Sequence, residues 1–281
     1  MEDAVGVGTA KAVPAIVRRH RLSTRLWHWV NALTVFLMLM SGLMIFNAHP
    51  RLYWGRYGAN PDHAWLEIGS AAERGYLRVG RVQVPTTGLL GYRRAADGVV
   101  NRRAFPGWAT IPSAYDLAAA RRWHFFFAWL LAIGLFAFLL ASLINRHAGR
   151  DLVPGPHELA PRHLWREIKD HARLRFPTGE AALRYNTLQK LSYFGVIFIL
   201  LPVMILTGLA MSPQMDAAWH WLVVLSGGRQ SARSIHFIAA FLILGFILVH
   251  LAMVLLAGPM NEIRSMITGR YRLPRDKEAE K

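Results

Sequence analysis

The sequence of 281 residues contains no cysteine. This absence excludes disulfides, thiolate-held iron–sulfur clusters, cysteine-ligated zinc and covalently attached c-type haem. Any redox centre must therefore be held by histidine or methionine side chains, or by non-covalent packing. The chain has twelve histidines.

Acidic residues are also scarce, with 17 Asp and Glu against 33 Lys and Arg, and the net charge is +16. Such a charge is compatible with nucleic-acid binding. However, 53% of the residues are hydrophobic, they gather into runs of about twenty, and the basic residues lie between the runs. This distribution is typical of a multi-pass membrane protein with basic flanks, in contact with lipids and with no nucleic-acid partner.

Four apolar runs are long enough to cross a bilayer, and they predict helices at about 26–46, 123–144, 188–211 and 234–257. The first run is too long for the core of a signal peptide, so we interpret it as a retained helix. We expect an all-α integral membrane protein, a four-transmembrane-helix bundle with a long external loop between helices 1 and 2.

The segments around the runs complete the predicted organisation. A membrane domain at 25–258 lies between a tail at 1–24 and a tail at 259–281, with loops at 47–120 and 145–187. Both tails and the second loop are basic, whereas the connection at 212–232 is not. Because basic segments stay in the cytoplasm, both termini are predicted to be cytoplasmic, with 47–120 and 212–232 on the outer side of a bacterial inner membrane.

Two segments outside the spans have patterns of their own. The residues Tyr76–Val84 are typical of a small β-hairpin. Within 157–176, apolar residues recur every four positions among charged ones, which predicts a short amphipathic helix on the membrane surface. A further interfacial helix is expected at Ala217–Leu225.

Histidines interrupt the last span at His236 and His250. Ionisable residues are costly within a membrane, so each is a functional candidate. Fourteen residues of helix rise about 21 Å and place both imidazoles on the same side. Imidazole is a common axial ligand of haem iron. The alternative is that each histidine is packed in the bundle and hydrogen-bonded to a neighbour.

Two further histidines match these two in depth. In the predicted orientation, His28 lies at the cytoplasmic edge of the first helix, as His250 does in the last. His124 lies at the outer edge of the second helix, as His236 does in the last. We therefore predict two stacked haems b, with axial ligand pairs His28/His250 and His124/His236 at the iron.

At this point the sequence resembles the di-haem cytochrome b subunits of formate dehydrogenase, nickel–iron hydrogenase and, above all, thiosulfate reductase, over residues 18–274. The resemblance rests on RLWHWVNAL, GLMIFNAHPRLYWGRYG, RRWHFFFAW, RFPTGEAALRYNTLQKLSYF and HFIAAFLILGFILVH. It implies electron transfer between quinone (ubiquinone or menaquinone) and a periplasmic molybdopterin-type oxidoreductase. It also implies that Asn186, Gln189 and Lys190 line a quinone site beside His250. Taken alone, these three residues are typical of helix capping and an interfacial anchor.

The loop at 47–120 has nine arginines and no lysine. Arginine with Tyr and Trp is enriched at protein interfaces, so we expect the partner to dock here, through Arg51, Arg56 and neighbours. The simpler alternative is a solvated surface. If a partner docks here, we expect the chain alone to have little activity beyond quinone–haem electron transfer. Two other functions stay open: a self-sufficient quinone-linked oxidase or reductase of a small oxidant, and an ion or proton carrier.

Overall fold

The computed structural model describes residues 16–95, 97–145, 153–173 and 186–273. The outer parts of both predicted tails, and parts of the predicted 145–187 loop, lie outside these ranges. The chain forms two compact units. The larger consists of His28–Val153 and Leu191–Leu248, and the smaller of Met1–Trp27, Pro154–Lys190 and Val249–Lys281.

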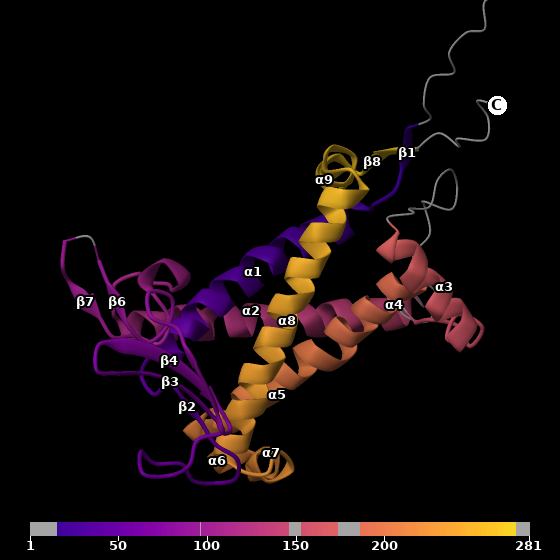
Figure 1. Cartoon of the computed structure of the whole chain (residues 1–281). Helices are drawn as coiled ribbons and strands as arrows, with labels where there is room; N and C mark the ends of the chain where they lie inside the picture. The colour runs from indigo at the N-terminus through magenta and orange to yellow at the C-terminus, as the bar shows by residue number, and fades with distance from the viewer. Residues whose placement is uncertain (1–15, 96, 146–152, 174–185, 274–281) are drawn as a thin grey trace, which may run out of the picture. The chain divides into compact units, whose positions relative to one another are not determined.

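Four helices in the described part of the chain are long and apolar enough to span a membrane. They are α1 (Leu22–Phe46), α2 (Leu117–Ile144), the third span Thr187–Met211, and α8 (Arg229–Ala257) (Figure 1). The predicted fold class is confirmed. Several helices begin before the predicted starts, because the polar or short apolar turns ahead of each long apolar run also belong to the helix. The start of α2, for example, is capped by Asp116, whose Oδ1 accepts a hydrogen bond of 2.8 Å from the Ala119 amide.

The third span is not uniform. It consists of α4 (Thr187–Phe194), a π-helical segment (Gly195–Leu200) and α5 (Leu201–Met211). Pro202 lacks an amide hydrogen and its ring crowds the preceding turn, which accounts for a widened turn at this point. Two short helices follow, α6 (Pro213–Ala218) and α7 (His220–Leu225), the second within the predicted interfacial segment.

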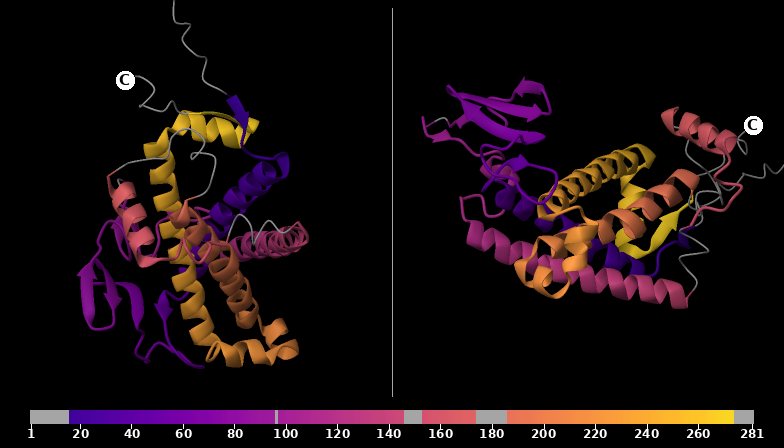
Figure 2. Two further views of the ribbon diagram at one scale, coloured as in Figure 1. Left: turned by 90° about the vertical axis from the view of Figure 1, so that its right-hand side faces the viewer. Right: turned by 90° about the horizontal axis from the view of Figure 1, so that it is seen from below.

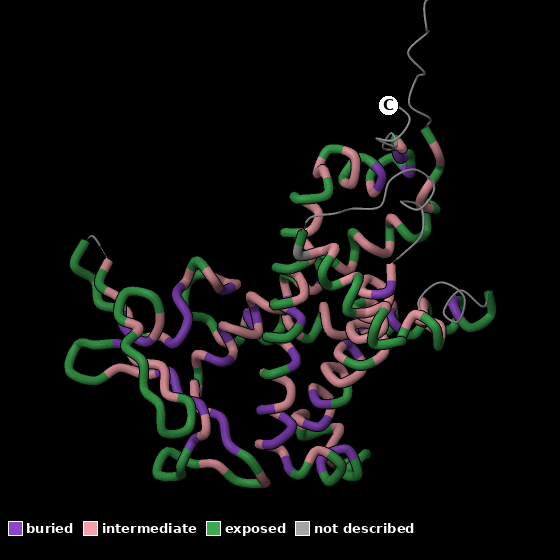
Figure 3. Tube along the Cα trace, turned by 45° about the vertical axis from the view of Figure 1, so that its right-hand side comes forward, coloured by how far each residue is buried: buried purple, intermediate pink, exposed green. Residues whose placement is uncertain are grey.

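The spanning helices keep most of their apolar surface exposed. Only 11–28% of the residues in the most apolar window of each helix are buried, and Figure 3 shows them mostly as intermediate or exposed. Large side chains such as Phe126 and Phe136 are 67% and 69% exposed. Exposed apolar surface on this scale is expected where lipid, rather than water, surrounds the helices.

The predicted external loop is folded. It contains a four-stranded antiparallel sheet in the order β2-β3-β4-β5, and a separate strand pair, β6 with β7 (Figures 1 and 2). The strands are β2 (Arg51–Leu52), β3 (Leu66–Ala71), β4 (Arg74–Val79), β5 (Val82–Pro85), β6 (Arg93–Arg94) and β7 (Val100–Asn101), and a 3₁₀ turn follows at Gly107–Ala109. The hairpin predicted at Tyr76–Val84 is confirmed as β4 and β5, with Leu77 opposite Val84.

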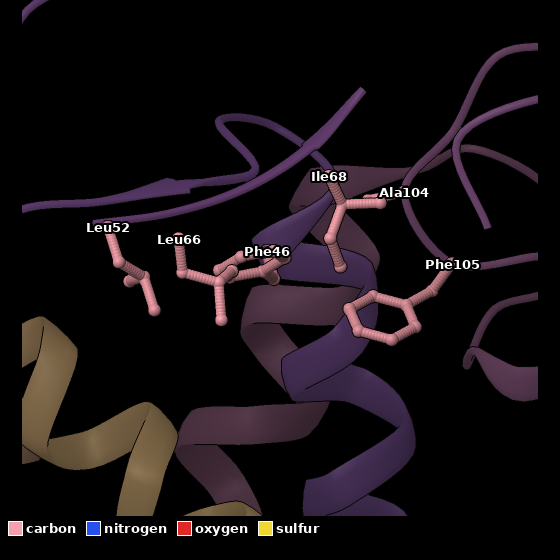
Figure 4. Close-up of a cluster of buried hydrophobic side chains, with 6 residues drawn as sticks. All are labelled: Phe46, Leu52, Leu66, Ile68, Ala104 and Phe105. Carbon is pink, nitrogen blue, oxygen red and sulfur yellow. The ribbon is translucent and has the colours of Figure 1, made fainter. Parts of the chain in front are cut away.

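One face of this sheet packs on the end of α1. Leu52, Leu66 and Ile68 from the strands join Phe46 of α1 in a buried cluster, which Ala104 and Phe105 complete (Figure 4). Phe237 of α8 packs against the same cluster, with its ring centroid 4.7 Å from that of Phe46. Apolar burial therefore fixes the sheet on the ends of two spanning helices.

The opposite face of the sheet is organised around Glu67, whose side chain is 4% exposed. Its Oε1 accepts hydrogen bonds from Arg51 Nη2 at 2.7 Å and Tyr76 Oη at 2.8 Å, and its Oε2 pairs with Arg78. Burial raises the pKa of the Glu67 carboxyl, but the bond from Tyr76 and the two guanidiniums outweigh it, so the pKa lies below its usual value. The carboxylate is thus kept charged, and it joins β2, β3 and β4.

The smaller unit contains both ends of the described chain. β1 (Ile16–Arg18) pairs antiparallel with β8 (Arg270–Arg272), which follows α9 (Pro259–Thr268). Arg19 and Glu262 form an ion pair of 3.1 Å. The predicted amphipathic helix is confirmed as α3 (Pro161–Ala172). Its Glu167 accepts hydrogen bonds from the Thr187 and Leu188 amides, at 3.2 and 3.1 Å, and so caps the third span.

Candidate functional site

Two histidines of the larger unit face each other between α2 and α8. His124 lies seven residues after the first residue of α2, and His236 lies seven residues after the first residue of α8. Their ring centroids are 6.4 Å apart, with 59° between the ring planes. The predicted pair His124/His236 is therefore brought together at one level.

Each of these rings is held through Nδ1 by a neighbouring helix. His124 Nδ1 lies 3.1 Å from Ser41 Oγ and 3.2 Å from the Met38 carbonyl oxygen, both in α1. His236 Nδ1 lies 3.0 Å from Thr207 Oγ1 in α5. Both hydroxyls donate their own hydrogen to a carbonyl one turn earlier in their helix, at 2.7 Å for Ser41 and 2.6 Å for Thr207. They therefore accept from Nδ1–H, which leaves the Nε2 lone pair of each ring available.

A glycine follows each of these hydroxyl residues and lets the helix approach the ring. A Cβ atom added to Gly42 would lie 3.3 Å from His124 Cε1, and one added to Gly208 would lie 3.5 Å from His236 Cε1. The two half-sites thus repeat one pattern, a hydroxyl residue and then glycine facing a histidine. None of these four residues was predicted to support a histidine, although the recurrence of Ser-Gly and Thr-Gly inside two apolar spans was a visible signal.

This geometry suits one metal ion held by two imidazoles. Two rings bound on opposite sides of an ion through bonds of about 2 Å have their centres roughly 6 Å apart. Histidine ligands usually donate their second ring N–H to an oxygen, as both rings do here. Facing histidines between membrane helices, in a chain without cysteine, are the arrangement of an integral membrane cytochrome b.

Comparison with known proteins agrees with this class. The chain belongs to the prokaryotic cytochrome b561 family, whose model matches residues 19–269. The resemblance to cytochrome b subunits is confirmed. The protein is accordingly a multi-pass bacterial membrane protein and an electron-transfer cytochrome, and its family implies haem b. When bound, haem b supplies one-electron chemistry, and His124 and His236 are the residues that would hold it.

Individual relatives are distant. A probable Ni/Fe-hydrogenase B-type cytochrome subunit of Cupriavidus necator is 24% identical over 287 residues, covering 98% of this chain and 93% of its own length. A putative protein-methionine-sulfoxide reductase subunit YedZ1 of Azospira oryzae is 24% identical, covering 83% of this chain and 87% of its own. The probable Ni/Fe-hydrogenase B-type cytochrome subunit of Azotobacter vinelandii is 22% identical, covering 80% of this chain and 75% of its own length.

The other predicted haem pair is divided between the two units. His28 lies in α1 in the larger unit, with its ring edge-on to Trp29 at a centroid distance of 5.2 Å. His250 lies in α8 in the smaller unit, fourteen residues after His236. Both are partly buried. Their pairing stays a prediction.

The predicted quinone residues lie together at the start of α4. Asn186 Oδ1 accepts from the Gln189 amide at 2.8 Å, and Gln189 Oε1 accepts from the Asn186 amide at 3.2 Å. This reciprocal exchange is a helix-capping arrangement. Lys190 Nζ lies 2.7 Å from Glu158 Oε1, and this bond lowers the pKa of Glu158. The contacts match the capping and anchoring alternative, and the quinone role stays a prediction.

Asn186 also has a contact that capping does not require. Its side-chain Nδ2 lies 3.1 Å from His171 Nε2, while His171 Nδ1 lies 2.8 Å from the Glu167 carbonyl oxygen. The carbonyl can only accept, so His171 carries its hydrogen on Nδ1 and accepts from Asn186 through Nε2. An imidazole that accepts through Nε2 therefore lies beside the amide that was predicted to contact quinone.

Proposed function

We propose that the chain passes electrons across the membrane between the quinone pool and a redox partner on the outer side, through two haems b. The observation that carries this proposal is the facing pair His124 and His236, with both Nδ1 atoms held and both Nε2 atoms available. We assign one haem to this pair and the second to His28 and His250. The fourteen-residue spacing of His236 and His250 supports two haems at two depths, about 21 Å apart along α8.

The orientation and the quinone site are parts of the same proposal. Basic residues concentrate in the tails and in the second loop, which supports cytoplasmic termini and an outer position for the sheet domain. The haem of His28 and His250 then lies near the cytoplasmic side. Asn186, Gln189 and Lys190 belong to that side too, where quinol, either ubiquinol or menaquinol, exchanges electrons with this haem.

The partner is an oxidoreductase on the outer side. Relatives are named as subunits of Ni/Fe hydrogenase and of a protein-methionine-sulfoxide reductase, and both names describe subunits of redox enzymes. The resemblance noted from the sequence favours a molybdopterin-type enzyme. A haem with two axial histidines has no open coordination position, so it is suited to passing electrons on to a protein partner rather than to binding substrate. We place the docking surface on the sheet domain at 47–120.

The assignment of the haems is tested by haem content. Pyridine haemochrome analysis of the purified protein should give two haems per chain, both extractable with acid acetone because no cysteine can attach them. His124→Ala, His236→Ala and the double variant should each lose one haem, and should leave the same residual spectrum. As a control, His220→Ala should keep both, since His220 is 71% exposed and pairs with Asp216 outside the spans. Different residual spectra for the two single variants would show that His124 and His236 do not share a haem.

A further inference from the structure

An arginine lies in α8 one turn before His236. Arg233 is partly buried, and its Nη2 donates a hydrogen bond to the His49 carbonyl oxygen. Its guanidinium lies over the ring of Phe46, 5.6 Å from the ring centre. Among the described residues, no carboxylate lies within ion-pair distance of it, although the arginines of the neighbouring sheet pair with Glu67. Burying a cation without an anion is costly, so this position is suited to an anion that the described part of the chain does not provide.

The side chain of His49, whose carbonyl Arg233 contacts, has a buried nitrogen with no hydrogen-bond partner in the described structure. His49 Nε2 is buried and makes no hydrogen bond within the described structure. The ring of His49 stacks on Tyr53 at 5.8 Å. Burial and the nearby charges of Arg233 and Arg51 lower the pKa of His49, so this ring is neutral at physiological pH and has one N–H to donate. A guanidinium and a neutral imidazole together form a recognition site for a carboxylate.

The position of this site relative to His236 indicates which carboxylate it takes. Three residues of helix rise about 4.5 Å, so Arg233 lies on nearly the same side of α8 as His236 and closer to the start of the helix. A haem carries two propionate carboxylates at one edge of its ring. In an apolar layer these charges are stable only where they reach the polar boundary or pair with a cation. A haem bound to His236 therefore brings carboxylates to the level of Arg233, which has no carboxylate partner among the described residues.

We propose that Arg233 and His49 bind a propionate of the haem held by His124 and His236. This inference rests on the proposed assignment of that haem. Arg233 supplies the charge and a planar pair of donors, and His49 supplies a single donor through its ring. Both are positioning residues that orient the haem in its plane, and Arg233 also favours reduced iron by placing a positive charge nearby.

The test uses the purified full-length protein with its haems and three variants. Arg233→Gln removes the charge, Arg233→Lys keeps the charge without the planar fork, and Arg121→Gln is a matched control. Arg121 also lies three residues before an axial histidine, His124, but it is exposed and stacks over Phe125. Redox titration gives the midpoint potential of each haem, and resonance Raman spectroscopy gives the propionate bending band, which shifts when propionate hydrogen bonds are lost. The haem of the His124/His236 pair is identified as the component missing in His124→Ala.

In Arg233→Gln, the equilibrium constant for reduction of that haem should fall at least tenfold. This corresponds to a midpoint potential lower by about 59 mV for one electron. The sign follows because removing a positive charge favours the more positive, oxidised iron. Its propionate band should shift as well. Arg233→Lys should keep most of the potential but still shift the band, and Arg121→Gln should leave the band unchanged. If Arg233→Gln does not assemble, Arg233→Lys and His49→Gln replace it. Both should shift the propionate band, and an unchanged band in both would overturn the inference.

Two kinds of failure can be told apart. If His124→Ala keeps both haems, the assignment of the axial pair is wrong. If His124→Ala loses one haem, but Arg233→Gln leaves the potential and propionate band of that haem unchanged, the pair stands and the propionate site is wrong. Loss of bound phospholipid from Arg233→Gln with an unchanged band would mean that a lipid phosphate occupies the site, and would likewise overturn the inference.

Discussion

An imidazole can bind a metal through one ring nitrogen only if that nitrogen keeps its lone pair, and the hydrogen must then lie on the other. In this chain the choice is made by two hydroxyl residues. Ser41 and Thr207 donate to carbonyls of their own helices and therefore accept from His124 and His236 through Nδ1. At the scale of the residue, the unit that we propose to hold the haem is thus a histidine together with a hydroxyl residue on a neighbouring helix.

Replacing Thr207 with valine should test this unit. Valine keeps the shape of the side chain but cannot accept the Nδ1–H of His236. Loss of such an outer contact typically weakens metal binding by about 10–100-fold. We expect Thr207→Val to lose the haem of the His124/His236 pair during purification or on dilution, and to raise its midpoint potential, because a weaker donor ligand stabilises the oxidised iron less.

The matched control for this experiment is Thr268→Val, at the end of α9. Thr268 likewise donates to a carbonyl of its own helix, at 2.7 Å, but contacts no histidine. That variant should keep both haems at unchanged potentials. Equal haem retention and equal potentials in Thr207→Val and the unmodified protein would mean that the hydroxyl does not support the ligand.

At the scale of the elements, the sequence was informative where the signal is local. Runs of apolar residues predicted four spans, alternation predicted the β4–β5 hairpin, and four-residue spacing predicted α3. The sheet of the 47–120 loop was not predicted, because its pairing depends on contacts between residues far apart in the chain. Arg51 pairs with Glu67 across sixteen residues, and Phe46 joins a cluster with Phe105. The same reason explains why Ser41 and Thr207 were missed: their role depends on which histidine the neighbouring helix presents.

The start of α4 is the element for which two roles compete. Asn186 caps the helix, and it was also predicted to contact quinone. Asn186→Ser separates these roles, since serine caps helices about as well as asparagine but has no amide to donate. If the amide contacts quinol, Asn186→Ser should slow haem reduction by a menaquinol or ubiquinol analogue at full haem content, and Asn186→Ala should slow it too.

If capping is the whole role of Asn186, a different pattern is expected. In Asn186→Ser, the quinol analogue should then reduce the haem at the normal rate. Asn186→Ala should only lose about 1 kcal/mol of helix stability. Stopped-flow absorbance of the haem bands measures the rates, and thermal unfolding followed by circular dichroism measures the stability. A normal rate in both variants would reject the quinone role of Asn186.

At the scale of the whole molecule, the charge of +16 is divided between two tasks. Basic residues in the tails and second loop are the signal that orients a membrane protein. The arginines of the 47–120 loop serve the sheet domain in part, because Arg51 and Arg78 neutralise the buried Glu67. Arg51 was predicted to contact a partner, but its guanidinium is bound to Glu67 and to the Asn60 carbonyl oxygen. Arg56 is exposed and forms no ion pair in the described structure, so we assign the proposed docking role mainly to Arg56 and to other exposed arginines of the loop.

Charge reversal at the two arginines should therefore have different effects. Arg56→Glu should weaken association with the redox enzyme that co-purifies with the tagged wild-type chain, most clearly at low salt, because screening diminishes interactions between exposed charges. Both haems and the protease resistance of the sheet domain should be unchanged. Arg51→Glu should instead make the domain protease-sensitive, since it places a carboxylate against the buried Glu67, and loss of one partner of a buried ion pair costs up to about 3–5 kcal/mol.

Arg264→Glu in α9, an exposed arginine on the predicted cytoplasmic side, serves as the control with the same change of charge. If Arg56→Glu and Arg264→Glu retain the partner equally at low salt, Arg56 is not part of the docking surface.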